Sequence, residues 1–146
     1  MYQVTRKNRI KEELQLCHAN GDVALTVGVD LNVDQIAGRV NKAYEVLGVA
    51  QDALKKDTKN EKLVEAYGAA VLAVFEVIFG KENAGRILDF YEGNYTEMLL
   101  DIFPFINGEI MPKIREASAS RREQLLQAAK LAEQGNRAAR RGHGRR

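Results

Sequence analysis

The chain has 146 residues, of which 45% are hydrophobic and 29% are charged, a balance typical of one globular domain with a packed core. Its single cysteine, Cys17, excludes an internal disulfide framework and fits a reducing compartment. The N-terminal residues lack the apolar stretch of a secretory signal. The longest apolar run, residues 69–75, is shorter than the roughly 20 residues that cross a bilayer. We therefore expect a cytoplasmic protein.

The net charge of +2 hides an uneven distribution along the chain. Residues 113–146 contain ten basic and three acidic residues, whereas residues 1–112 contain twelve basic and seventeen acidic ones. Clustered arginines pair well with phosphates and carboxylates, so the basic C-terminal part could bind nucleic acid or an acidic protein. It could equally serve only to keep the protein soluble, and the sequence leaves these alternatives open.

Residues 12–31 predict a β-hairpin. Asn20-Gly21 is a strong signal for a type I′ turn, which needs positive φ at both central residues. Apolar residues alternate with polar or small ones on both sides of this turn. One face of the hairpin is therefore apolar, and another element must cover it, because an isolated hairpin is marginally stable in water.

Helical patterns follow the hairpin. Asn32 can cap a first helix, whose apolar residues recur every three or four positions from Val33 to Leu54. A second helix, residues 61–79, is apolar nearly all round from Ala66 to Phe79, which predicts burial in the core or in an oligomer interface. A third helix covers residues 81–92, and Gly93 ends it.

The second half of the chain is interrupted by two prolines. Asn94 can cap a fourth helix that Pro104 either ends or restarts, and Pro112 predicts a kink or a break. A last helix is expected over residues 117–134. Its narrow apolar stripe consists of Leu125, Leu126, Ala129 and Leu131. Residues 135–146 show no apolar pattern and are predicted to be disordered.

These patterns predict a mainly α fold. We expect a compact helical domain of about five helices, with an N-terminal β-hairpin and a flexible basic C-terminal tail. Residues 1–134 would form this single domain, with the hairpin at residues 12–31 and helices from residue 33 onward. Residues 135–146 would form the disordered tail.

No combination of residues predicts catalysis, so we expect neither enzymatic activity nor a cofactor. Cys17 and His18 are neighbours on a predicted strand, where adjacent side chains point to opposite faces, so they cannot readily form a nucleophile–base pair. We expect a buried Cys17 beside an exposed His18. The only other histidine, His143, lies in the basic tail, and no cluster of metal ligands exists. The glycine spacing matches no phosphate-binding loop.

The most distinctive segment extends from Phe79-Gly80 to Ile114. It contains RILDFYEGNYTEML at residues 86–99, Pro104-Phe105-Ile106, and Ile110-Met111-Pro112-Lys113-Ile114. Over residues 22–116 the chain resembles the tail assembly chaperones, small proteins encoded in the tail-assembly region of long-tailed bacteriophages of Gram-positive hosts. This resemblance implies a protein that sheathes the tape-measure protein in the host cytoplasm while tail-tube subunits polymerise, and that is absent from the mature virion.

A chaperone of this kind needs apolar surface to offer to its client, the tape-measure protein and, as a further partner, the tail-tube protein. The proline-interrupted segment is the candidate for that surface. Its large apolar residues are Phe103, Phe105, Ile106, Ile110 and Ile114. A homo-oligomer is also compatible with the apolar second helix. Two alternatives remain: a nucleic-acid-binding accessory protein that acts through the basic tail, and a structural tail or connector component.

Overall fold

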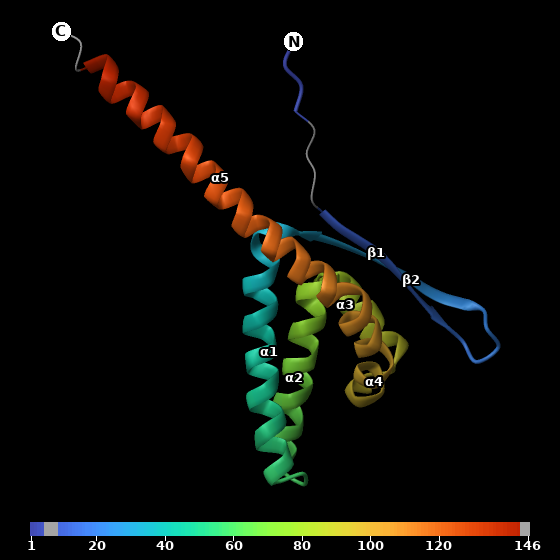
Figure 1. The fold of residues 1–146 in the computed structure, drawn as a ribbon. Coiled ribbons are helices and arrows are strands. Elements are labelled where there is room, and N and C mark those ends of the chain that lie inside the picture. Colours follow the sequence, from blue (N-terminus) through green and yellow to red (C-terminus); the bar gives the residue numbers. More distant parts are fainter. Residues whose placement is uncertain (5–8, 144–146) are drawn as a thin grey trace.

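The computed structural model describes residues 1–4 and 9–143 and confirms the predicted fold class, a mainly α protein with an N-terminal β-hairpin (Figure 1). The elements are β1 (Arg9–Cys17), β2 (Val23–Asn32), α1 (Val33–Lys56), α2 (Glu61–Phe79), α3 (Lys81–Phe90), α4 (Tyr95–Phe105), the π-helical segment η1 (Ile106–Ile110) and α5 (Met111–His143). No helix of the described residues is long and apolar enough to span a membrane.

The hairpin pairs β1 and β2 antiparallel, with Ile10 opposite Leu31 and Leu14 opposite Val27. It is longer than predicted at both ends, since the apolar alternation includes Ile10. Its inward face packs against the helices, mainly through β2 and α2. The buried side chains of this face are Ile10, Leu16, Val27, Val29 and Leu31.

The predicted type I′ turn is wrong. Within the loop of residues 18–22 only Gly21 has a positive φ, of 90°. The Gly21 N–H donates to the His18 carbonyl at 2.9 Å, and the Asn20 side chain accepts from the Asp22 N–H at 3.0 Å. This side-chain bond lets Asn20 form a local turn without a left-handed conformation, so glycine alone supplies the unusual φ.

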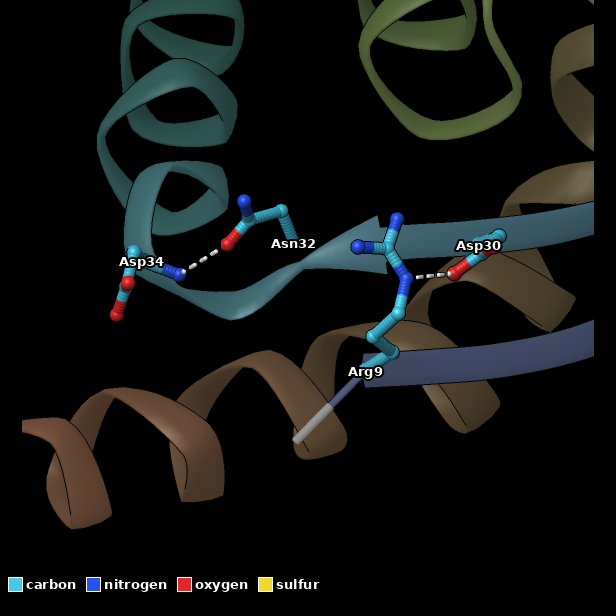
Figure 2. Close-up of polar contacts among 4 residues, drawn as sticks. All are labelled: Arg9, Asp30, Asn32 and Asp34. Atoms are coloured by element: carbon cyan, nitrogen blue, oxygen red, sulfur yellow. Dashed lines mark hydrogen bonds and ion pairs between the residues drawn. The ribbon is translucent and has the colours of Figure 1, made fainter. Parts of the chain in front are cut away.

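Three asparagines begin helices, as their positions in the sequence suggest. The Asn32 side chain accepts from the Asp34 N–H at 3.0 Å, which starts α1 directly at the end of β2 (Figure 2). Beside it, Arg9 Nε lies 2.6 Å from Asp30 Oδ1 and joins the two strands. Asn60 and Asn94 cap α2 and α4 in the same way. A side-chain cap satisfies N–H groups that the helix itself leaves without partners.

The core lies around α2, which contacts α1, α3, α4 and β2. The prediction that α2 is buried on several sides is confirmed, with Val71, Val74, Phe75 and Ile78 almost inaccessible. The α1 stripe is confirmed as well, since Ile36, Val40, Ala43 and Leu47 are buried. Figure 1 shows α1 and α2 side by side, with α3 and α4 beside α2.

From Tyr95 to His143 the chain is one continuous helical run, and no break occurs at the prolines. Pro104 lies inside α4, and Pro112 is the second residue of α5. The π-helical segment η1 lies between them. A helix can absorb local disruption in a π-turn and still continue.

Helix α5 is also longer than predicted, because it begins at Met111 and ends at His143. Residues 135–143, where a disordered segment was predicted, continue α5 as helix, and residues 144–146 lie outside the described residues. Alanine and arginine are strong helix formers, and they continue the helix here without any apolar stripe.

Candidate protein-binding surface

The five residues predicted to bind a partner do not lie on one exposed surface. Ile106 and Ile110 are fully buried, and Ile114 is 4% exposed. For these three isoleucines the predicted role as a partner surface is wrong, because they belong to the protein's own core. The continuous helical run explains the result: the prolines do not turn this segment away from α1 and α2.

Phe103 and Phe105 are half-buried and anchored on the core. The Phe103 ring lies 6.2 Å from Phe75 in an edge-to-face arrangement and 5.9 Å from the Tyr44 ring. Phe105 stacks on Phe79 with a centroid distance of 6.4 Å. These aromatic pairs favour a structural role, because each ring already has a partner within the chain.

Residues of α1 hold η1 in place. The Tyr44 hydroxyl contacts Asn107 Oδ1 at 3.5 Å, and burial raises the pKa of Tyr44 to about 12. Helix α5 continues from η1 and packs against both η1 and α1. Two ion pairs support its base: Lys113 with Glu12 of β1, and Arg121 Nε with Asp34 Oδ1 at 3.7 Å.

Beyond this base α5 projects from the body (Figure 1). Every residue from Ala119 to Gly142 is exposed. Leu125 is 56% exposed, Leu126 64% and Leu131 68%. An isolated helix is marginally stable in water, and most helical stability in proteins comes from packing an apolar face. The projecting part of α5 therefore presents apolar side chains that no described part of the chain covers.

Helical spacing divides these side chains between two sides of α5. Leu125, Ala128, Ala129 and Ala132 are three or four residues apart, so they form one narrow strip, which we call the alanine–leucine stripe. Arg122, Leu126 and Lys130 are four residues apart and form a neighbouring strip, which we call the basic strip. The prediction of one narrow apolar stripe is therefore wrong, because Leu125 and Leu126 lie on different strips and Leu131 lies on neither. The sequence also does not reveal that this part of α5 has no other described element opposite it.

The residues weighed for chemistry do not converge. Cys17 is exposed, contrary to prediction, because Leu16 occupies the inward position of β1 and its neighbour faces out. The His18 ring packs 6.2 Å from the Phe90 ring. Among residues 1–4 and 9–143 no group of three His, Cys, Asp or Glu could hold a metal ion, and no polar or charged side chain is buried.

A cleft of about 760 Å³ lies between β2, the first turns of α1 and the junction of α2 with α3. Its floor is apolar, with Leu31, Ile36 and Phe79, and Arg39 and Lys81 lie on its rim. It is wide and open, and no cluster of reactive side chains lines it. The exposed strips of α5 are therefore the best-defined candidate site on the described surface.

No protein-family model, curated protein or solved structure matches this chain. The function is accordingly inferred from the surface that the fold exposes and from the resemblance carried by residues 22–116.

Proposed function

We propose that this protein is a non-enzymatic tail assembly chaperone of a long-tailed bacteriophage, and that it binds the tape-measure protein through the alanine–leucine stripe of α5. The resemblance over residues 22–116 suggests the class of protein. The proposed mode of binding rests on one observation. Every residue from Ala119 to Gly142 is exposed, on a helix that projects from the body.

The stripe suits a long helical client. Leu125 supplies one large apolar side chain, and the alanines beside it let the backbone of a second helix approach closely. Packed helices lie about 8–10 Å apart, and small contact residues favour the shorter distance. An amphipathic client helix would cover the stripe with its own apolar residues, as in helix-in-groove recognition. Because α5 is exposed, such binding requires no unfolding of the core.

The proposal places the protein in the host cytoplasm during tail assembly and outside the mature virion. Tail-tube subunits would then displace it as they polymerise around the tape-measure protein. A structural tail or connector component would instead remain in the particle. Mass spectrometry of purified virions separates the two, because a chaperone leaves no stoichiometric signal for this chain.

The binding test is a pull-down of the tape-measure protein of the same genome, coexpressed with the tagged full-length chain. The stripe variant is Leu125→Glu/Ala132→Glu, which places two carboxylates seven residues apart on the stripe. The matched control is Gln127→Glu/Gln134→Glu, which has the same spacing on the opposite side of α5. Burying an unpaired carboxylate in an apolar contact is costly, so the stripe variant should lose the client.

The control variant should retain the client, and both variants should melt like the parent protein because all four positions are exposed. Equal retention of the client by both variants would contradict binding through the stripe. Failure of the parent chain to retain the tape-measure protein would contradict the proposed function itself.

A nucleic-acid-binding role is the second candidate, and one observation favours it. Residues 119–142 contain six basic and two acidic residues, and all eight are exposed on the projecting helix. Phosphate contacts make affinity steeply dependent on salt. Retardation of DNA or RNA at low salt, lost on raising the salt and lost in Arg140→Glu/Arg141→Glu, would support this role. Unretarded nucleic acid at low salt would remove it.

A further inference from the structure

The charges of the described surface are segregated between two regions. The projecting residues 119–142 carry six basic and two acidic residues. The segment of α3, α4 and η1, residues 81–110, carries six acidic and two basic residues, and all eight are exposed. Its acidic residues are Glu82, Asp89, Glu92, Glu97, Asp101 and Glu109. The net charges of the two regions are equal in magnitude and opposite in sign.

Several of these carboxylates lie together around Tyr91. Glu92 and Glu97 line the same shallow depression as Tyr91. Burial, followed by the influence of Asp101 and Glu97, raises the pKa of the Tyr91 hydroxyl well above its usual value. Leu100, on the same helix as Glu97 and Asp101, is 70% exposed. This acidic patch, defined by Glu92, Glu97, Leu100 and Asp101, therefore has an apolar residue among its charges.

The basic strip of α5 has the complementary composition. Leu126 is 64% exposed and lies between Arg122 and Lys130. Neither cation forms an ion pair within the part of the chain that the structure describes, whereas Arg121 and Arg137 are paired with Asp34 and Glu133. Two cations beside a leucine match carboxylates beside a leucine in both charge and apolar content.

The two surfaces cannot meet within one molecule. Helix α5 leaves η1 in a direction away from the body, as Figure 1 shows, and its packing partners are α1 and η1. Pairing α5 with the α5 of another copy would bring together two helices that each carry an excess of positive charge. Like charges placed opposite each other disfavour association.

We propose that the basic strip of α5 docks on the acidic patch of a second copy of this chain. The contact joins two different surfaces, so in a pair one copy retains a free acidic patch and the other retains a free basic strip. Such head-to-tail contacts form rings when the rotation closes and open chains when it does not. This inference goes beyond the proposed function, because the partner is the protein itself and no client is required.

The test measures mass against concentration by sedimentation velocity, with the full-length protein in low and in high salt. Association should raise the mass above the monomer value of 16.3 kDa at low salt. Added salt should reverse the association, because the charges of the basic strip and of the acidic patch are exposed and are screened by salt. The basic-strip variant, Arg122→Glu/Lys130→Glu, and the acidic-patch variant, Glu92→Lys/Glu97→Lys, should each weaken association by about tenfold or more. Leu126→Ala and Leu100→Ala should each weaken it as well.

A mixture of the two charge variants provides the decisive control. The acidic α5 of one variant matches the basic patch of the other, and the remaining pair of surfaces is native, so mixing should restore association. The neutral pairs Arg122→Gln/Lys130→Gln and Glu92→Gln/Glu97→Gln repeat the test with milder changes if a reversal lowers the melting temperature. A mass that stays monomeric at all concentrations in low salt overturns the proposal. Association that survives the acidic-patch changes, or a mixture that fails to reassociate, overturns it too.

Discussion

Replacing Gly68 by alanine can stabilise or destabilise the protein, and one contact, with the Tyr95 ring, decides which. This glycine lies inside α2, and a Cβ atom built there would be 2.8 Å from Cδ2 and Cε2 of the Tyr95 ring. Carbon atoms in favourable contact are about 3.5–4.0 Å apart, so either the ring or α2 must move. The ring belongs to the first residue of α4, where Asn94 caps the helix, and this limits how far it can shift.

Two opposing contributions determine how far Gly68→Ala changes the free energy of unfolding. Replacing a glycine inside a helix by alanine gains roughly 1 kcal/mol of helix propensity. Overpacking a well-filled site costs about 1–3 kcal/mol. Gly68→Ala should therefore destabilise the protein by up to about 2 kcal/mol. At roughly 2–4 °C per kcal/mol the melting temperature would fall by several degrees.

The assay is urea unfolding followed by circular dichroism, with Gly38→Ala as the matched control. Gly38 is also helical, but nothing lies within 4 Å of a Cβ atom there, so this change should stabilise the protein by about 0.5–1 kcal/mol. In a Tyr95→Ala background Gly68→Ala should become stabilising as well. If Gly68→Ala stabilises the parent protein as much as Gly38→Ala does, the reasoning about this contact is refuted.

Three further predictions concern the turn, the core and the effect of pH. Gly21→Val places a β-branched residue at a φ of 90°, so thermal unfolding should shift downward by several degrees, and an unchanged midpoint would mean that this turn does not support the fold. Ile110→Ala removes a fully buried side chain and should cost about 2–5 kcal/mol in urea unfolding, while Leu131→Ala on the exposed helix should cost almost nothing; equal costs would contradict the assignment of Ile110 to the core. Because burial raises the pKa of Tyr44 from 10.0 to about 12, the tyrosine favours folding at low pH, and this stability is lost as the pH rises from 10.0 to about 12. Tyr44→Phe should flatten that decline in unfolding free energy, and an identical pH profile would contradict the burial of the hydroxyl.

Local signals predicted most of the fold. The caps at Asn32 and Asn94 correctly predicted the starts of α1 and α4, because these signals act within a few residues. The buried stripe of α1 followed from its periodicity. The turn type was mispredicted because the Asn20 side chain bonds to the nearby backbone, a choice that the Asn-Gly pair alone does not reveal.

The candidate site was harder to predict, since it depends on what lies opposite a helix face. Composition cannot show whether Ile106 meets the core or a partner, because both require the same apolar side chain. The prolines suggested a broken segment, but the helical run continues through η1 and keeps Ile106 and Ile110 buried. Conversely, Leu125 and Ala129 are four residues apart, a spacing typical of a buried helix face, and only the course of α5 shows that they are uncovered.

The central claim is that α5 is an exposed helix that a client covers. Hydrogen exchange tests it most directly, in dilute protein alone and with the tape-measure protein added. The amides of residues 119–142 should exchange rapidly in the free protein and slow down in the complex, while those of α2 stay protected in both. A complex in which residues 119–142 exchange as fast as before would contradict the claim.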